Sequence, residues 1–327
     1  MALRIYIVRR ALQAIPLLFI ISVLSYLLMA LAPGDVLALF EDPGATHAAT
    51  QLQREQVLNR LGLDVSIPMQ YLNWMKGIVL DANFGYSFLD GQPVFHKIVE
   101  RIPATLWLTV TALVISLIIA IPIGVYSAVK RNSFVDLLFS FYSYLGISSP
   151  TFFVALIAIL FFSFKMEWTP VSGMREVYDH FSFVDRMKHL ILPATVLSFG
   201  MVAGNTRFIR SSMLEVINQD YIRTARAKGL SEFKVIFKHS LRNALLPIIT
   251  IVAMQLPIIV GGAFIIEQIF GWPGLGRLAI TAVFMRDYPL IMGTTMLVAV
   301  AVILCNLLAD VMYAVVDPRI RFQKREN

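Results

Sequence analysis

Long apolar runs constrain the fold of this chain more than any other feature of its sequence. A helix that crosses the hydrocarbon core of a bilayer needs about 20 predominantly apolar residues. Six stretches reach or approach that length: Ala11–Leu31, Ala104–Val129, Leu137–Phe164, Leu190–Thr206, Ala244–Ile266 and Leu290–Val316. Only 15% of the 327 residues are charged, whereas soluble domains carry about 25%. We therefore predict an all-α integral membrane protein with six transmembrane helices.

The first apolar run also has some features of a secretory signal peptide. Arg9 and Arg10 precede it, and Ala30-Leu31-Ala32 resembles a cleavage site. However, the apolar core of a signal peptide is about 7–15 residues long, and this run is longer. We therefore interpret the run as an uncleaved transmembrane helix.

The distribution of Lys and Arg predicts the orientation, because short cytoplasmic segments are enriched in both residues. Four segments carry this excess: the N-terminus, the turn after the second run, the segment after the fourth run and the C-terminal tail. With six spans, all four fall on the same side of the membrane. We therefore predict that both termini lie in the cytoplasm (N-in/C-in), in a multi-pass protein.

The spans and the segments between them divide the chain into four parts. Residues 1–31 form the N-terminal tail and the first transmembrane helix, and residues 317–327 form a cytoplasmic tail. Residues 32–103 are too many for a simple loop, and we predict a small external domain there, with a helix-like stretch at Gln51–Leu61. Residues 104–316 hold transmembrane helices 2–6 and a cytoplasmic segment, 207–243.

The apolar runs contain essentially no ionisable side chains. Asp136, Glu267 and Asp310 lie near the ends of the runs. Proton- and sodium-coupled carriers place carboxylates or histidines at the middle of the membrane. If this chain transports a solute, its energy must therefore come from another source. No charged ring or carbonyl filter sequence of a channel is evident either.

Several classes of chemistry have no support in the sequence. There is no Gly-x-x-x-x-Gly-Lys-[Ser/Thr] phosphate loop and no His-Glu-x-x-His, and the histidines are scattered outside the runs. We therefore predict no catalytic residues, cofactor or metal, and we disfavour the alternative of a membrane-embedded enzyme. The net charge of +7 comes mostly from residues beside the runs, so no nucleic-acid partner is expected. The single cysteine, Cys305, permits no intrachain disulfide.

Mild polar residues inside the runs have two possible roles, namely hydrogen bonding between helices and lining of a water-filled path. The candidates for a translocation path are Ser148, Asn205, Gln255 and Thr294. Gly200 and Gly204 have the spacing that permits close helix approach.

The cytoplasmic segment predicts a very short helix. Asp220 can cap a helix that starts at Tyr221, and Gly229 can end it after Lys228. Ile222 and Ala225 then share one apolar face, together with a possible contribution from Tyr221. Because a two-turn helix is not stable alone in water, it needs a surface. The candidates are anionic lipid headgroups and a protein partner. The small residues of this helix favour the protein.

This segment resembles the ATPase-contacting loop of ABC importer permeases, specifically of the dipeptide, oligopeptide and nickel family. In the general pattern of Glu-Ala-Ala followed by glycine, Arg223-Thr224-Ala225 takes the place of the triplet and Gly229 that of the glycine. The arginine in place of glutamate and the distant Leu246-Pro247 suit this branch. Further matches include Phe84-Gly85-Tyr86-Ser87, Arg210–Val216, Glu267–Gly276 and Arg286–Pro289. The long first external segment resembles that of the B-type subunit.

The resemblance implies a permease subunit that imports di- or oligopeptides across a bacterial or archaeal inner membrane. Nickel or other metal chelates and other small solutes are alternative substrates. The implied partners are a second permease, two ABC ATPase subunits, an external substrate-binding protein and the lipid bilayer. The residues implied in ATPase coupling are Glu215, Asp220, Tyr221, Ile222, Arg223, Thr224, Ala225, Arg226, Ala227, Lys228, Gly229 and Leu230. Among them we expect Arg223, Ala225 and Gly229 to contribute most to docking.

Overall fold

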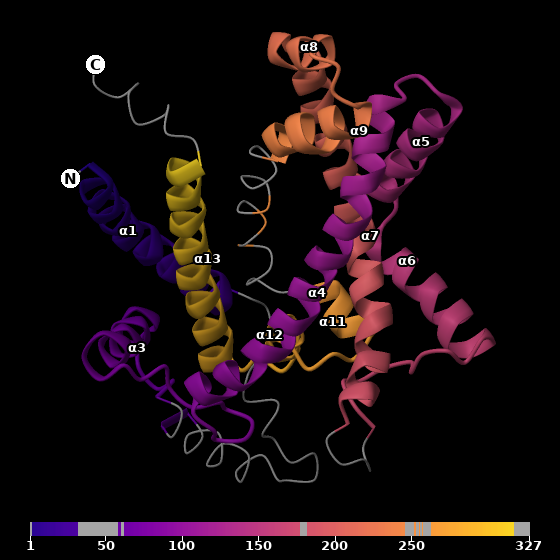
Figure 1. Ribbon diagram of the computed structural model, residues 1–327. Coiled ribbons are helices and arrows are strands. Elements are labelled where there is room, and N and C mark those ends of the chain that lie inside the picture. Colours follow the sequence, from indigo (N-terminus) through magenta and orange to yellow (C-terminus); the bar gives the residue numbers. More distant parts are fainter. Residues whose placement is uncertain are drawn as a thin grey trace. The chain divides into compact units, whose positions relative to one another are not determined.

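The computed structural model describes residues 2–31, 58–59, 62–176, 182–245, 252, 255, 257 and 263–316. Within these residues the fold is helical (Figure 1), and the only β pairing is an isolated bridge between Tyr86 and Pro93. Residues 1–103 with 274–303 form one compact unit, and residues 104–273 with 304–327 form a second. The predicted helix at Gln51–Leu61 lies mostly outside the described residues, and the tail at 317–327 lies entirely outside them.

Among the described residues, four helices are long and apolar enough to cross a membrane. They are α1 (Ala2–Leu31), α4 (Val94–Val129), α7 (Phe183–Ile217) and α13 (Tyr288–Val316). These helices confirm four of the six predicted runs as long apolar helices. Most of the fifth run, Ala244–Ile266, lies outside the described residues, so that span and the N-in/C-in orientation remain predictions.

The third apolar run is a bent pair of helices. Helix α5 (Phe134–Ser148) is followed by α6 (Thr151–Ala158) and the π-helix η2 (Ile159–Lys165), with a bend of 103° between the two parts. The expectation of one continuous helix over Leu137–Phe164 is therefore wrong. The break falls at Ser149 and Pro150, both of which have extended backbones. Proline lacks an N–H and disfavours helical geometry in the residue before it.

Helices of the second unit approach closely at glycines other than the predicted pair. A Cβ atom at Gly124 would lie 2.7 Å from Cγ2 of Ile209, and one at Gly146 would lie 2.9 Å from Cβ of Ala203. These contacts bring α4 and α5 against α7. At Gly200 and Gly204 an added Cβ would meet no described atom within 4 Å. Within the part of the chain that the structure describes, no helix makes use of the close approach that the spacing of Gly200 and Gly204 permits.

In the second unit, a buried cluster surrounds the segment that links α11 (Phe264–Ile269) to α12 (Leu275–Phe284). The Trp272 indole is buried and donates a hydrogen bond of 2.8 Å to the carbonyl oxygen of Ala104. Thr105 Oγ1 donates a bond of the same length to the buried carboxylate of Glu267. These bonds tie α4, at Ala104 and Thr105, to this segment.

In the first unit, Asp287 organises a hairpin-like segment around Tyr86 and Pro93. Its buried carboxylate accepts hydrogen bonds from the Ser87 hydroxyl and, at 3.1 Å, from the backbone N–H of Phe88. Nearby, the Lys97 ammonium lies 2.7 Å from Asp90. Two motifs that are far apart in the sequence therefore meet through Asp287.

Candidate functional site

The short helix predicted in the basic segment is present as α8, Asp220–Ala227. The capping prediction needs correction, because Asp220 is the first helical residue and Gln219 holds the N-cap position without a side-chain hydrogen bond. An aspartate in the first turn still stabilises a helix through the positive end of the helix dipole. Asp220 also lies 3.6 Å from Arg223, although both side chains are largely exposed.

Gly229 ends α8 in the way that the sequence predicts. Its φ angle is +75°, in the left-handed region that residues with a Cβ rarely adopt. The Gly229 N–H donates to the carbonyl of Arg226 at 2.9 Å, and the Leu230 N–H donates to the carbonyl of Ala225 at 3.4 Å. This pair of bonds is a Schellman motif, which satisfies two carbonyl groups at the end of the helix.

The apolar face of α8 is covered by the chain itself. Ile222 and Ala225 are 0% and 7% exposed, and they form a buried cluster with Val216 and Val235. This confirms that Ile222 and Ala225 share one buried face, whereas Tyr221, at 46% exposed, does not belong to it. Because Ala225 is buried within the chain, the expectation that it contributes strongly to docking is wrong.

The opposite face of α8 is open. The exposed residues of α8 and of the turn that follows it are Asp220, Tyr221, Arg223, Thr224, Arg226, Ala227, Lys228, Gly229 and Leu230. Ala227 and Gly229 have little or no side chain, so the backbone can be approached closely there. Of the three residues expected to dominate docking, Arg223 and Gly229 are therefore available to a partner.

The helix that follows α8 provides its seat. Ser231 occupies the N-cap position without a side-chain hydrogen bond, and α9 (Glu232–Lys234) continues directly into the π-helix η3 (Val235–Ser240). Residues 241–245 prolong the helix. The π-helical turn has no clear signature in the sequence. Arg226 Nε lies 2.8 Å from Glu232 Oε1 and so links α8 to this helix.

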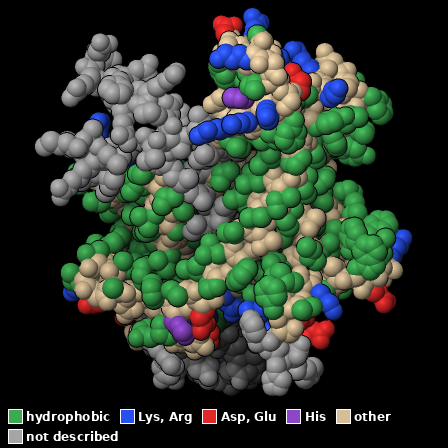
Figure 2. All heavy atoms as spheres, viewed as in Figure 1, with side chains coloured by type: hydrophobic (Ala, Val, Ile, Leu, Met, Phe, Trp, Pro, Cys, Tyr) green, Lys and Arg blue, Asp and Glu red, His purple; other side chains and the backbone are tan. Residues whose placement is uncertain are grey.

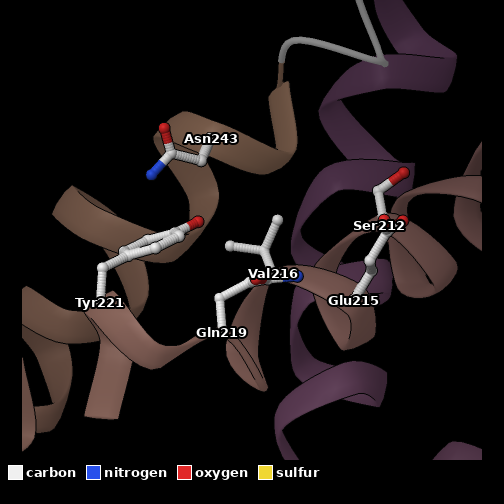
Figure 3. Close-up of a pocket in the computed structure, with 6 residues that line it drawn as sticks. All are labelled: Ser212, Glu215, Val216, Gln219, Tyr221 and Asn243. Carbon is white, nitrogen blue, oxygen red and sulfur yellow. The ribbon is translucent and has the colours of Figure 1, made fainter. Parts of the chain in front are cut away.

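A cleft of about 460 Å³ lies beside the start of α8. Figure 3 shows Tyr221 and Asn243 on one side of it and Ser212 and Glu215 on the other. Val216 and Gln219 complete the lining. Glu215 belongs to the last turns of α7, so grouping it with the short helix needs correction; it lies beside α8, across the cleft from Tyr221.

The end of α7 that carries α8 is bound to α5 by an ion pair that the sequence did not reveal. Arg210 Nε and Nη2 each lie 2.8 Å from a different oxygen of Asp136. Asp136 is buried and also accepts the backbone N–H of Asn132 at 2.9 Å. Such bidentate geometry fixes the mutual orientation of the two groups. In the sequence, Arg210 stands out only as part of the motif Arg210–Val216 and as one of the basic residues that predict the orientation in the membrane.

The four candidate path residues have different surroundings. Asn205 is buried, donates to Ser116 Oγ at 3.1 Å and accepts from Gln255 Nε2 at 2.8 Å. Thr294, in the first unit, is buried and bonds to the carbonyl oxygen of Leu290 in its own helix. Ser148 is exposed at the end of α5. The structure thus joins only Asn205 and Gln255, and a path role for all four remains a prediction.

The charge distribution around the short helix differs from that of the long helices. Figure 2 shows hydrophobic side chains along the long helices and Lys and Arg side chains around α8 and α9. Within the described residues, no group of three or more His, Cys, Asp or Glu side chains could hold a metal ion. The long apolar helices define the class of the protein as a multi-pass membrane protein.

Comparisons with known proteins give the family. Residues 120–322 match the family described as binding-protein-dependent transport system inner membrane component, and residues 3–109 match the N-terminal family of the same transport systems. The chain therefore belongs to the family of inner membrane components of binding-protein-dependent transport systems. Members are non-catalytic permease components.

Similar curated proteins cover nearly the whole chain. The oligopeptide transport system permease protein AppB of Bacillus subtilis is 46% identical over 97% of this chain and 99% of its own length. A putative peptide permease protein of Brucella suis is 44% identical over 97% of this chain and 98% of its own length. The glutathione transport system permease protein GsiC of Escherichia coli is 39% identical over 97% of this chain and 99% of its own length.

A solved structure shows the same fold. A chain of the MetNI methionine ABC transporter in an inward-facing conformation has a TM-score of 0.54 and 18% identity. The match covers 68% of this chain and 97% of that one. At this level of identity the match supports the arrangement of the helices and carries no information about the substrate.

Proposed function

We propose that this chain is one of the two permease subunits of an ATP-driven importer that moves di- or oligopeptides across a bacterial or archaeal inner membrane. A binding protein outside the membrane delivers the peptide, and two ATPase subunits inside supply the energy. The names of the relatives support a peptide substrate, because oligopeptide and peptide permeases are 44–46% identical over nearly the whole chain. Glutathione, named for a third relative, is itself a tripeptide.

The observation that carries the proposal is the seating of α8. Its apolar face is buried on its own chain, and its small and basic residues are open. A helix held in this way is a rigid projection suited to insertion into a groove of a partner ATPase. Because this chain has no phosphate loop of its own, the energy has to enter through such a contact.

The contacts around α8 support a mechanism of transmission. Closure of the ATPase pair on ATP moves the groove and, with it, α8. Val216 of α7 packs against the buried cluster that contains Ile222 of α8, and the Arg210–Asp136 pair connects α7 to α5. Movement of α8 therefore tilts the spans as rigid bodies, so that the path opens alternately to the two sides.

The proposed topology has six spans with both termini inside. It places α8 and the basic segment 207–243 in the cytoplasm, where the ATPases are, and it places residues 32–103 outside, where the binding protein is. The excess of Lys and Arg in segment 207–243 supports this orientation. The proposed lining of the path comprises Ser148, Asn205, Gln255 and Thr294, of which Asn205 and Gln255 are hydrogen-bonded to each other.

The test of the substrate is uptake by the complete complex in proteoliposomes. The complex, its binding protein and ATP are offered labelled di- to pentapeptides and, in parallel, nickel–histidine. Peptide uptake that requires ATP is the expected result. Uptake of nickel–histidine without peptide uptake would move the assignment to metal chelates. Uptake of neither, or accumulation in the opposite direction, would contradict a peptide importer.

A further inference from the structure

The helix that seats α8 exposes an aromatic pair on its outer face. Phe233 and Phe237 are 70% and 48% exposed, and their ring centroids are 4.6 Å apart. They lie one turn apart on the helix formed by residues 232–245. Two neighbouring aromatic rings with this much exposure form an apolar feature that water solvates poorly.

The orientation of this pair is fixed by the opposite face of the helix. Val235, Ser240 and Ala244 are fully buried. Val235 and Ser240 are five residues apart, which is the repeat that π-helical hydrogen bonding aligns, and Ala244 follows one α-helical turn later. Because this face is held against the rest of the unit, the phenylalanines cannot turn inward without unseating α8.

A row of positive charge accompanies the aromatic pair. Lys234, Lys238 and Arg242 recur at intervals of four residues, and all three are exposed. The neighbouring Glu232 carboxylate is engaged by Arg226 at 2.8 Å. Among the described residues, no carboxylate lies within ion-pair distance of these three cations. The outer face of the helix is therefore both aromatic and cationic.

The position of the helix relates this face to the bilayer. The described part of the helix reaches Ala244, where the predicted fifth apolar run begins, so the helix leads toward that predicted span. Figure 1 shows the helix that begins at α9 running across the direction of the membrane-spanning helix α7. A helix that crosses the spans and leads into one of them lies along the membrane surface.

We propose that helix 232–245 is an interfacial helix that binds anionic phospholipid headgroups. Phe233 and Phe237 insert at the level of the headgroups and upper acyl chains, and Lys234, Lys238 and Arg242 contact the phosphates. An apolar stripe beside a Lys/Arg stripe is the composition by which surface helices bind anionic bilayers. Since α8 packs against this helix, lipid binding holds α8 at a fixed distance from the bilayer surface. This proposal does not depend on the identity of the transported substrate.

Spin labelling of the full-length chain tests the proposal. Cys305 is the only cysteine, so a Cys305→Ala background accepts one label at a time through Phe233→Cys, Phe237→Cys or, as a matched control, Tyr221→Cys on the open face of α8. The protein is placed in nanodiscs of phosphatidylcholine with phosphatidylglycerol. We expect the labels at 233 and 237 to collide several-fold more with oxygen, relative to a water-soluble nickel complex, than the label at 221.

Two further measurements separate lipid from other partners. Neutralising the cations together by Lys234→Gln, Lys238→Gln and Arg242→Gln should lower the oxygen-to-nickel ratio at 233, as should nanodiscs of phosphatidylcholine alone. Full access of the nickel complex to positions 233 and 237 in anionic nanodiscs would overturn the proposal. Protection that arises only when the ATPase subunits are added would also overturn it, because the face would then bind protein.

Discussion

Arg226 and Glu232 lie 2.8 Å apart and link the last turn of α8 to the first turn of the helix that follows. Beneath this surface ion pair, Ile222 packs against Val235 across the same junction. A pair as exposed as Arg226 and Glu232 contributes only about 0.5 kcal/mol, whereas burial of an isoleucine side chain contributes about 1.5–3 kcal/mol. The apolar contact therefore seats α8, and the ion pair orients the junction.

The first prediction concerns this apolar contact. Replacement of Ile222 by alanine should weaken the packing of α8 on its own chain by about 2–5 kcal/mol, because it leaves a cavity at a fully buried position. Since α8 is only two turns long, we expect it to detach from its seat. Stimulation of ATP hydrolysis by the loaded binding protein should then be lost in the reconstituted complex.

Ile222→Val is the matched control for that variant. It removes one methylene group and should cost only about 0.5–1.5 kcal/mol, which leaves most of the stimulation intact. Equal behaviour of the alanine and valine variants would contradict the view that this contact holds α8 in place.

The second prediction concerns the link between α7 and α5. Asp136→Asn removes the charge that meets Arg210 and places an amide group where donors now point. We expect the free energy of unfolding to fall by about 1–3 kcal/mol. This is less than for a fully buried ion pair, because the Arg210 side chain is 28% exposed. The midpoint of thermal unfolding of the detergent-purified chain should fall.

Arg210→Lys supplies the comparison for Asp136→Asn. Lysine keeps the positive charge but lacks the guanidinium fork that forms two parallel hydrogen bonds. The unfolding midpoint of Arg210→Lys should therefore fall less than that of Asp136→Asn. An unfolding midpoint that neither substitution changes would show that the pair does not stabilise the fold.

The third prediction concerns Asp287 in the first unit. Asp287→Asn leaves a donor facing the hydroxyl of Ser87 or the N–H of Phe88, and an unsatisfied buried polar group costs about 1–3 kcal/mol. The segment between Ala82 and Pro93 should then open more often. Limited proteolysis in this segment is expected to become several-fold faster.

Asp90→Asn is the control for Asp287→Asn in the same segment. Burial opposes ionisation of Asp90, but hydrogen bonds from Lys97 and the Gln92 N–H outweigh it and hold the pKa below its ordinary value. Asp90 therefore contributes stability at neutral pH that is lost as the pH falls through this lowered pKa. Because its side chain is 41% exposed, the contribution is small. Proteolysis rates that rise equally in both variants would contradict the central role of Asp287.

Local patterns in the sequence predicted much of the fold. Apolar runs that reach or approach about 20 residues identified the long helices, and Gly229 with Ile222 and Ala225 identified the end and the buried face of α8. Each of these signals depends on residues within a few positions of one another. That is the range over which helix caps and helical periodicity operate.

Other features required the three-dimensional structure. Pro150 breaks its run, whereas Pro193 is accommodated inside α7, so the presence of proline alone does not distinguish the two outcomes. The pairs Asp136–Arg210 and Ser87–Asp287 join residues 74 and 200 positions apart and have no local signature. The cover of Ala225 by Val235 likewise depends on a chain reversal that composition does not specify.

The most direct test of the account is the coupling of ATP hydrolysis to the open face of α8. Gly229→Asp adds a charged side chain at a position of φ +75°, and Gly91→Asp introduces the same residue at φ +68°; at both sites the added Cβ meets no described atom within 4 Å. Ala227→Lys adds bulk on the same face of α8 without a change of backbone conformation.

The measurement is peptide-stimulated ATP hydrolysis by the reconstituted complex, with ATPase subunits retained on the purified permease as the second readout. We predict that Gly229→Asp and Ala227→Lys lose the stimulation of ATP hydrolysis and retain less ATPase. Gly91→Asp, which introduces the same backbone strain away from α8, should keep normal stimulation. Undiminished stimulation in both α8 variants would contradict the claim that this short helix transmits the energy of ATP to the membrane spans.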